Sequence, residues 1–227
     1  MMDFNTDLAT EYEKGIRRTL PSYEAMLRLT QTFFQSTLPD EATFLIVGAG
    51  SGNEIYQFAE QKPDWSFVGV DPAEAMLQFA AARLHSLPNS ISLLPGTLLD
   101  TKLPVTTYDA ASCLLVLHFI NSYDEQLATL KAIAQHLKPG APFVLVSKYG
   151  QLGSPETELQ FDLWRAYWLQ HTKLTAEQVA TMEQSIRSLS FLREEDILTL
   201  LQEAGFTQPS RFFATTLFAG WICFKQN

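Results

Sequence analysis

The sequence contains little cysteine, histidine or basic residue. It has two cysteines and four histidines, and 16 lysines and arginines stand against 25 aspartates and glutamates. Cys113 and Cys223 lie in apolar runs, where a free cysteine behaves as a small hydrophobic side chain. We therefore expect neither a disulfide framework nor a zinc site. No group of His, Cys and Asp has metal-ligand spacing, so no metal is predicted.

The small number of positively charged residues limits which macromolecules the protein can bind. The formal net charge is -9, and non-specific nucleic-acid binding depends on Lys and Arg that neutralise phosphates. Bulk charge therefore argues against DNA or RNA. A local patch such as Arg17 and Arg18 leaves a tRNA partner open.

Long hydrophobic runs are also missing. The longest apolar run, 112–120, contains a histidine and is shorter than the roughly 20 residues that span a bilayer. The first residues, MMDFNTDLATEYEK, are acidic and lack the apolar stretch of a secretory signal. We expect a soluble, cytoplasmic protein without a membrane partner. Its 227 residues, 46% of them hydrophobic, can bury the core of a single domain.

Strand-length apolar runs alternate with segments of helical period along the chain. The segments between the runs carry apolar residues three and four positions apart, which indicates helices that cover a sheet. Right-handed crossovers then predict an α/β fold with a doubly wound, Rossmann-like and mainly parallel sheet. The predicted strands are 43–47, 66–70, 91–94, 110–117 and 142–147, and the predicted helices between them are 53–61, 73–84 and 124–137.

The two ends of the chain add further elements. An amino-terminal helix is predicted at 22–35 and a last helix at 194–204, which Gly205 ends. Two closing strands, 210–215 and 217–224, are too close together for a crossover helix. They must therefore pair antiparallel.

Residues 150–188 do not fit the alternation and look like an inserted pair of helices. Aromatic side chains occur there at helical spacing, including Phe161, Trp164 and Trp168. Such a stripe usually packs in a core. Because the insertion follows the fifth strand, it could instead form a lid over the ligand-binding edge, or a homodimer interface.

The stretch FLIVGAGSGNEI places Gly48, Gly50 and Gly52 directly after the first strand. A dinucleotide fingerprint has its third glycine where Asn53 stands, which argues against NAD. A nucleoside with an amino-acid tail also needs close backbone approach, and its carboxylate can use the N–H groups of a helix end. The spacing therefore favours such a nucleoside.

Asp71 ends the second strand about 20 residues beyond the glycine turn, where a carboxylate can accept both ribose hydroxyls. It also precedes Pro72, so it could cap the following helix. The two roles are compatible.

These features together resemble class I S-adenosylmethionine-dependent methyltransferases. The resemblance rests on GAGSG, on Asp71 and on YDAASCLLVLHF at the fourth strand. It implies a seven-stranded sheet in the order 3-2-1-4-5-7-6, with the last strand antiparallel. It also implies S-adenosylmethionine as cofactor, S-adenosylhomocysteine as product and methyl transfer to a small-molecule acceptor. The implied parts are a helical cap at 1–40, a cofactor-binding core at 41–149, a helical insertion or lid at 150–188, and a last helix with the closing strand pair at 189–227.

RRTLPSYEAM and the insertion resemble a narrower branch, which contains carboxy-S-adenosylmethionine synthase, an enzyme of tRNA wobble-uridine modification. That branch holds the extra carboxylate with an arginine, but Met182 stands at the corresponding position here, and Arg187 is a doubtful replacement. We therefore keep the carboxylated cofactor as an alternative. The cofactor contacts that the resemblance implies fall on Tyr23, Gly48, Ala49, Gly50, Asp71, Pro72, Thr97, Leu98 and Leu114.

Two positions depart from the methyltransferase pattern. Ile46 stands where most class I methyltransferases have an acidic residue before the first glycine. Thr97 stands where another acidic residue usually accepts the adenine amino group, although a hydroxyl can also accept that N–H. Both changes should weaken cofactor binding.

Methyl transfer needs an aligned nucleophile more than a catalytic side chain. His118, at the end of the predicted fourth strand, is the candidate general base, with Tyr149 and His171 as weaker candidates. The aromatic, mostly uncharged insertion suggests an apolar or aromatic acceptor. A non-catalytic protein that binds an adenosyl ligand remains the alternative from another class.

Overall fold

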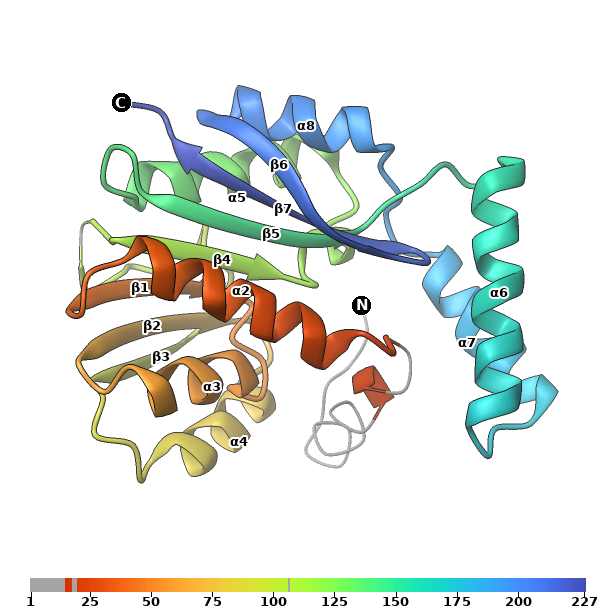
Figure 1. Cartoon of the computed structure of the whole chain (residues 1–227), viewed down its shortest axis with the longest axis horizontal. Coiled ribbons are helices and arrows are strands. Elements are labelled where there is room, and N and C mark those ends of the chain that lie inside the picture. Colours follow the sequence, from red (N-terminus) through yellow and green to blue (C-terminus); the bar gives the residue numbers. More distant parts are fainter. Residues whose placement is uncertain (1–14, 18–19, 106) are drawn as a thin grey trace.

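The computed structural model describes residues 15–17, 20–105 and 107–227. Its middle layer is a seven-stranded sheet in the order β3-β2-β1-β4-β5-β7-β6 (Figure 1). The pairings are parallel from β3 through β5, and β7 is antiparallel to both β5 and β6, which confirms the predicted fold. The strands are β1 (Ala42–Val47), β2 (Trp65–Asp71), β3 (Ile91–Pro95), β4 (Ala110–Leu114), β5 (Pro142–Lys148), β6 (Phe206–Thr215) and β7 (Phe218–Lys225).

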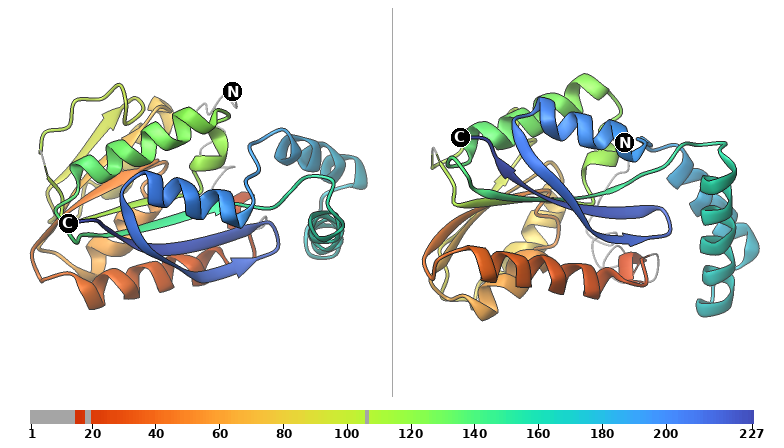
Figure 2. Two further views of the ribbon diagram at one scale, coloured as in Figure 1. Left: turned by 90° about the horizontal axis from the view of Figure 1, so that it is seen from above. Right: turned by 45° about the horizontal axis from the view of Figure 1, so that its top comes forward.

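Helices cover both faces of the sheet (Figure 2). One face carries a core in which Phe34, Phe44 and Phe58 contact one another ring to ring. The opposite core includes Phe143 and Leu200. The first face is covered by α2 (Tyr23–Thr37), α3 (Asn53–Gln61) and α4 (Glu74–Leu84), and the second by α5 (Tyr123–His136) and α8 (Glu194–Glu203).

The predicted insertion is a pair of helices, α6 (Pro155–His171) and α7 (Ala176–Arg187). The side chain of Ser154 caps α6, which has a proline in its first turn. Thr175 and Gln178 form a capping box at the start of α7. The pair stands beyond the carboxyl ends of the parallel strands (Figure 1). Whether it acts as a lid stays a prediction.

Strand β4 is shorter than predicted. It ends at Leu114, and Leu115 has a positive φ of 61° that turns the chain out of the sheet. Leu117–Phe119 then form a 3-10 turn, η1. Leu117 and His118 are buried in this turn, so the apolar run continued past the end of the strand.

Strand β6 begins at Phe206 rather than at 210, and the register shifts between Thr207 and Ser210. Gln208 has a positive φ of 54° there, next to Pro209, which cannot donate a ladder hydrogen bond. Because this stretch is irregular, its residues do not show the pattern of a strand, and the predicted strand began too late.

Helix α2 confirms the predicted amino-terminal helix. Of the predicted cap 1–40, residues 1–14 and 18–19 lie outside the described part. Within the described residues, no helix is long and apolar enough to cross a membrane.

Candidate functional site

A cavity of about 210 Å³ opens at the carboxyl ends of β1, β2 and β4. It lies where the chain order of the strands reverses, which is where open α/β sheets bind ligands. Seven of the nine predicted cofactor contacts line it: Gly48, Gly50, Asp71, Pro72, Thr97, Leu98 and Leu114.

The glycine turn between β1 and α3 has left-handed backbone geometry. Gly48, Gly50 and Gly52 have φ values of 81°, 50° and 77°. A Cβ on Gly48 would overlap the Val116 side chain. The N–H groups of Gly48 and Ala49 both donate to the carbonyl of Val70, at 2.8 and 3.0 Å. These bonds hold the turn against β2 and leave bare backbone at the cavity.

Asp71 joins the glycine turn to the start of α4. One carboxylate oxygen accepts from the N–H of Gly50 and the other from the N–H of Ala73, both at 2.8 Å. Burial raises the pKa of Asp71, and the two backbone donors oppose that shift. Each oxygen keeps lone-pair capacity for a further donor. The capping contact is therefore present, and the ribose contact stays a prediction.

Thr97 also lines the cavity, and its hydroxyl donates to Asp100 at 2.7 Å. Since the proton is committed to Asp100, the hydroxyl oxygen keeps lone pairs for an incoming N–H. This arrangement fits the predicted acceptor role.

Two predicted contacts lie outside the cavity lining. The Ala49 side chain is buried in the core beneath the turn. Tyr23 is nearly buried, its hydroxyl is 3.5 Å from Nδ2 of Asn53, and the guanidinium of Arg17 lies 5.3 Å from its ring centre. Tyr23 therefore lies beside the start of α3.

His118 is not placed as the predicted general base. It lies in η1 rather than at a strand end, it is 5% exposed, and it does not line the cavity as its neighbour Phe119 does. Burial, and secondarily the charge of Lys148, lowers the pKa of His118 to about 3. Of the weaker candidates, His171 packs against the ring of Tyr167 at the end of α6.

The aromatic stripe of the insertion is core rather than a ligand surface. Phe161, Trp164 and Trp168 are each at most 1% exposed. The two tryptophans pack on each other and on Val179 between α6 and α7. These rings therefore give no support to an apolar or aromatic acceptor, which stays a prediction.

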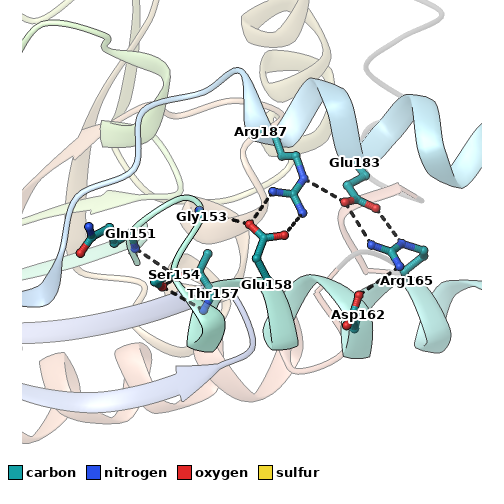
Figure 3. A network of polar contacts seen from close by, with 9 residues as sticks. All are labelled: Gln151, Gly153, Ser154, Thr157, Glu158, Asp162, Arg165, Glu183 and Arg187. Carbon is teal, nitrogen blue, oxygen red and sulfur yellow. Dashed lines mark hydrogen bonds and ion pairs between the residues drawn. The ribbon is translucent and has the colours of Figure 1, made fainter.

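Ion pairs join the two helices of the insertion (Figure 3). Arg187 donates to both oxygens of Glu158, at 2.9 and 2.6 Å, and to Glu183 at 2.9 Å. Arg165 also pairs with Glu183, at 2.8 Å. Met182 packs among the tryptophans of the helical pair. Arg187 is thus committed within the insertion, and Met182 offers no charge.

A second hollow, of about 740 Å³, lies between the start of α6 and the β6–β7 turn. Tyr149, Arg193, Glu194 and Arg211 are among its lining residues, and Arg211 pairs with Glu194 at 2.7 Å. The sequence did not predict this polar hollow, because its walls come from three separate stretches of the chain, within 149–160, 193–194 and 211–217.

Sequence reasoning also missed several cavity residues. Met76 from α4, Val116 and Phe119 from the turn after β4, and Thr129 from α5 line the cavity. The PG pair at Pro95 and Gly96 was the available signal for the loop after β3. Within the described residues, no group of three or more His, Cys, Asp and Glu is placed to hold a metal.

Residues 45–143 match the family described as "Methyltransferase domain". Carboxy-S-adenosyl-L-methionine synthase of Nautilia profundicola is 20% identical over 225 residues, which cover 98% of this chain and 94% of that protein. The uncharacterized methyltransferase YdaC of Bacillus subtilis is 29% identical over 123 residues, which cover 52% of this chain and 64% of that protein.

Solved structures share the fold. S-adenosylmethionine-bound CalS10, an amino pentose methyltransferase from Micromonospora echinaspora, has a TM-score of 0.64 and 19% identity, with 95% of this chain and 96% of that chain covered. Magnesium protoporphyrin IX methyltransferase from Synechocystis, with bound S-adenosylhomocysteine, has a TM-score of 0.68 and 14% identity, with 99% of this chain and 96% of that chain covered.

Proposed function

We propose that the chain, which has the fold of class I methyltransferases and matches a methyltransferase domain at residues 45–143, transfers the methyl group of S-adenosylmethionine to a small-molecule acceptor. The observation that carries this proposal is the cavity at the end of β1. There the glycine turn, Asp71 and Thr97 line a single opening.

The residues of the cavity fit an adenosyl ligand with an amino-acid tail. Asp71 offers acceptor oxygens for the ribose hydroxyls, and Thr97 offers one for the adenine amino group. Leu98 and Met76 supply apolar walls for the base. Gly48 and Gly50 expose backbone where a side chain would obstruct the ligand.

Positioning is the main task of the protein in this reaction. The bound cofactor supplies a methyl group that its sulfonium already makes electrophilic. Asp71 is the only ionisable side chain among the described residues that line the cavity. The chain therefore acts by orienting the reactants and excluding water, which can lower a barrier by about 7 to 11 kcal/mol.

A carboxylated cofactor is the second candidate, because the similarity to carboxy-S-adenosyl-L-methionine synthase extends over nearly the whole chain. The insertion argues against it. Arg187 already forms ion pairs with two glutamates, and Met182 cannot pair with a carboxylate. We therefore favour the ordinary methyl donor.

The test begins with the purified protein, denatured so that any bound small molecule is released and weighed by mass spectrometry. S-adenosylmethionine, S-adenosylhomocysteine and the carboxylated compound differ in mass. Calorimetric titration with S-adenosylhomocysteine then measures affinity, and labelled S-adenosylmethionine reports transfer to pooled small molecules. A protein that binds none of the three compounds contradicts the proposal, and binding without transfer to any acceptor supports a non-catalytic binding protein instead.

A further inference from the structure

The first turn of α3 buries a carboxyl group, one oxygen of which has no hydrogen-bond partner among the described residues. Glu54 is 8% exposed, and its Oε1 has no hydrogen-bond partner among the described residues. Ser112, on β4, is fully buried, and its hydroxyl has no partner there either. The Ser112 hydroxyl lies near enough to Glu54 to lower the pKa of its carboxyl, and Glu54 Oε1 remains available as an acceptor.

A third unpartnered group lies at the same level of the core. Glu54 is one helical turn before Phe58, and Thr30 of α2 is one turn before Phe34. Both phenylalanine rings contact Phe44. Ser112 stands two residues beyond the partner of Phe44 on β4, and the Thr30 hydroxyl is also buried and unpartnered. Buried oxygen atoms without a hydrogen-bond partner among the described residues thus occur on α2, α3 and β4.

Such a group of atoms is costly in an empty core. Each buried polar atom without a partner costs about 1 to 3 kcal/mol, and a charged atom costs more. Burial raises the pKa of Glu54 to about 7, and the Ser112 hydroxyl opposes that shift. No charged group in the described part of the chain lowers that pKa. From α4, Arg83 bonds to Asn53 and to the carbonyl of Ser51.

The other titratable groups near Glu54 are uncharged. Tyr23 of α2 lies beside Asn53, and Cys113 of β4 has a pKa that burial and the nearby Glu54 raise. On β1, the register partner of Ser112 is the apolar Ile46. Glu54 is therefore the carboxyl group that this side of the glycine turn offers to a cation.

The position of Glu54 relates it to the ligand cavity. It lies four residues beyond Gly50, and Ser112 lies two residues before Leu114, and both Gly50 and Leu114 line the cavity. Glu54 and Ser112 thus belong to the two segments, the glycine turn with α3 and strand β4, that contribute Gly50 and Leu114 to the cavity lining. A compact group with several N–H donors fits such a set of acceptors.

We propose that Glu54 and the Ser112 hydroxyl receive the ammonium group of the cofactor's amino-acid tail, and that Glu54 gives up its proton to solvent when this group binds. The inference rests on the proposed function. Glu54 would supply the negative charge that balances the ammonium group of the tail. Ile46, which stands where most class I methyltransferases have an acidic residue, cannot supply it.

Calorimetric titration with S-adenosylhomocysteine measures the released proton directly. The binding heat is compared at fixed pH in phosphate and in Tris, whose ionisation enthalpies differ. Because burial raises the pKa of Glu54 to about 7, the release is expected to be larger at pH 7 than at pH 8. Methylthioadenosine, which lacks the amino-acid tail, is expected to release none.

Glu54→Gln keeps the shape of the side chain and removes the titrating group. We expect it to abolish proton release and to weaken binding of S-adenosylhomocysteine at pH 8 at least tenfold. Glu60→Gln, at the exposed end of the same helix, is the control and should change neither. Circular dichroism checks that each variant folds, and Ser112→Ala, expected to weaken binding severalfold, serves if Glu54→Gln does not fold.

The outcomes separate this inference from the proposed function. Binding by the wild type without proton release, or release that persists in Glu54→Gln, overturns the role of Glu54 alone. Equal release with methylthioadenosine also overturns it, because the tail is then not the cause. If the wild type does not bind S-adenosylhomocysteine at all, the proposed function and this inference both fail.

Discussion

The backbone N–H of Lys148 donates a hydrogen bond to Nδ1 of His118, over 3.3 Å. A ring nitrogen that accepts a hydrogen bond carries no proton, so the neutral imidazole holds its proton on Nε2. The hydroxyl of Ser147 lies 3.4 Å from the same nitrogen. His118 is therefore held as a neutral ring that can donate a hydrogen bond from Nε2. In this tautomer neither ring nitrogen is free to take up a proton from an acceptor.

This geometry predicts how His118 titrates. Since burial lowers its pKa to about 3, the ring should remain the neutral Nε2–H tautomer from pH 8 down to pH 5. Nitrogen-15 NMR of the ring, assigned with His118→Gln, measures this directly. Imidazolium signals from His118 at pH 6 would show that the buried geometry is wrong.

Lys148 should make stability depend on pH. It is 1% exposed, Nζ donates to the carbonyl of Ile186, and burial lowers its pKa from 10.5 to about 7. Between these values the unfolded chain holds a proton that the folded chain has lost, so stability rises with pH. The free energy of unfolding should increase by up to about 4 kcal/mol from pH 7 to pH 10.

Urea unfolding at pH 7, 8.5 and 10 tests the lysine. Lys148→Met should remove the rise over this range. Lys131→Met, on the exposed face of α5, is the matched control and should retain it. Equal pH dependence in the wild type and in Lys148→Met would assign the effect to another group.

Asp71 should serve both the fold and the ligand. Asp71→Ala removes the acceptor of the Gly50 and Ala73 N–H groups, and it should lower affinity for S-adenosylhomocysteine by about 1.5 to 3 kcal/mol. Calorimetry measures this loss. Asp64→Asn, exposed at the opposite end of β2, is the control. Unchanged affinity in Asp71→Ala would leave Asp71 with the capping role alone.

Gly48 should tolerate no side chain. In Gly48→Ala the new methyl group overlaps Val116, and the φ of 81° adds strain. We expect a stability loss of several kcal/mol, of which the left-handed backbone accounts for about 1 to 2 kcal/mol. Gly153 has a φ of 79°, and a Cβ there would have no neighbour within 4 Å. Gly153→Ala should therefore lose only the stability that the left-handed backbone costs.

A double-mutant cycle separates the two causes at Gly48. In the Gly48→Ala background, Val116→Ala should recover the stability that is lost through the overlap. The stability that is lost through the left-handed backbone should not be recovered. Thermal unfolding of the four proteins gives the coupling. Purely additive effects would mean that Val116 moves aside without cost.

Arg187 should stabilise the insertion without touching the cofactor. Arg187→Met removes its bonds to Glu158 and Glu183, and we expect a loss of about 1 kcal/mol because these pairs are partly exposed. Limited proteolysis within α6 and α7 should become faster, while affinity for S-adenosylhomocysteine should change less than twofold. Arg28→Met, on the exposed face of α2, is the control. A large loss of affinity in Arg187→Met would show that Arg187 contributes to ligand binding.

Local patterns sufficed for much of this architecture. Helix α3 occupies the predicted 53–61, and the closing strands pair as their short connection required. The errors at the end of β4 and the start of β6 have one cause. Positive φ values at Leu115 and Gln208 redirect the chain, and neither residue type announces that geometry.

The sequence by itself determined the order of the elements, because periodicity and turn glycines act over short distances along the chain. The family resemblance, which also rests on the sequence, pointed to seven of the residues that line the cavity. The tertiary structure alone decided the rest. The burial of His118, the ion pairs of Arg187 and the unpartnered Oε1 of Glu54 depend on groups from distant segments. The contacts between these segments decide how buried each side chain is and which partners it has. Burial and partners in turn decide its charge and the groups that it can bind.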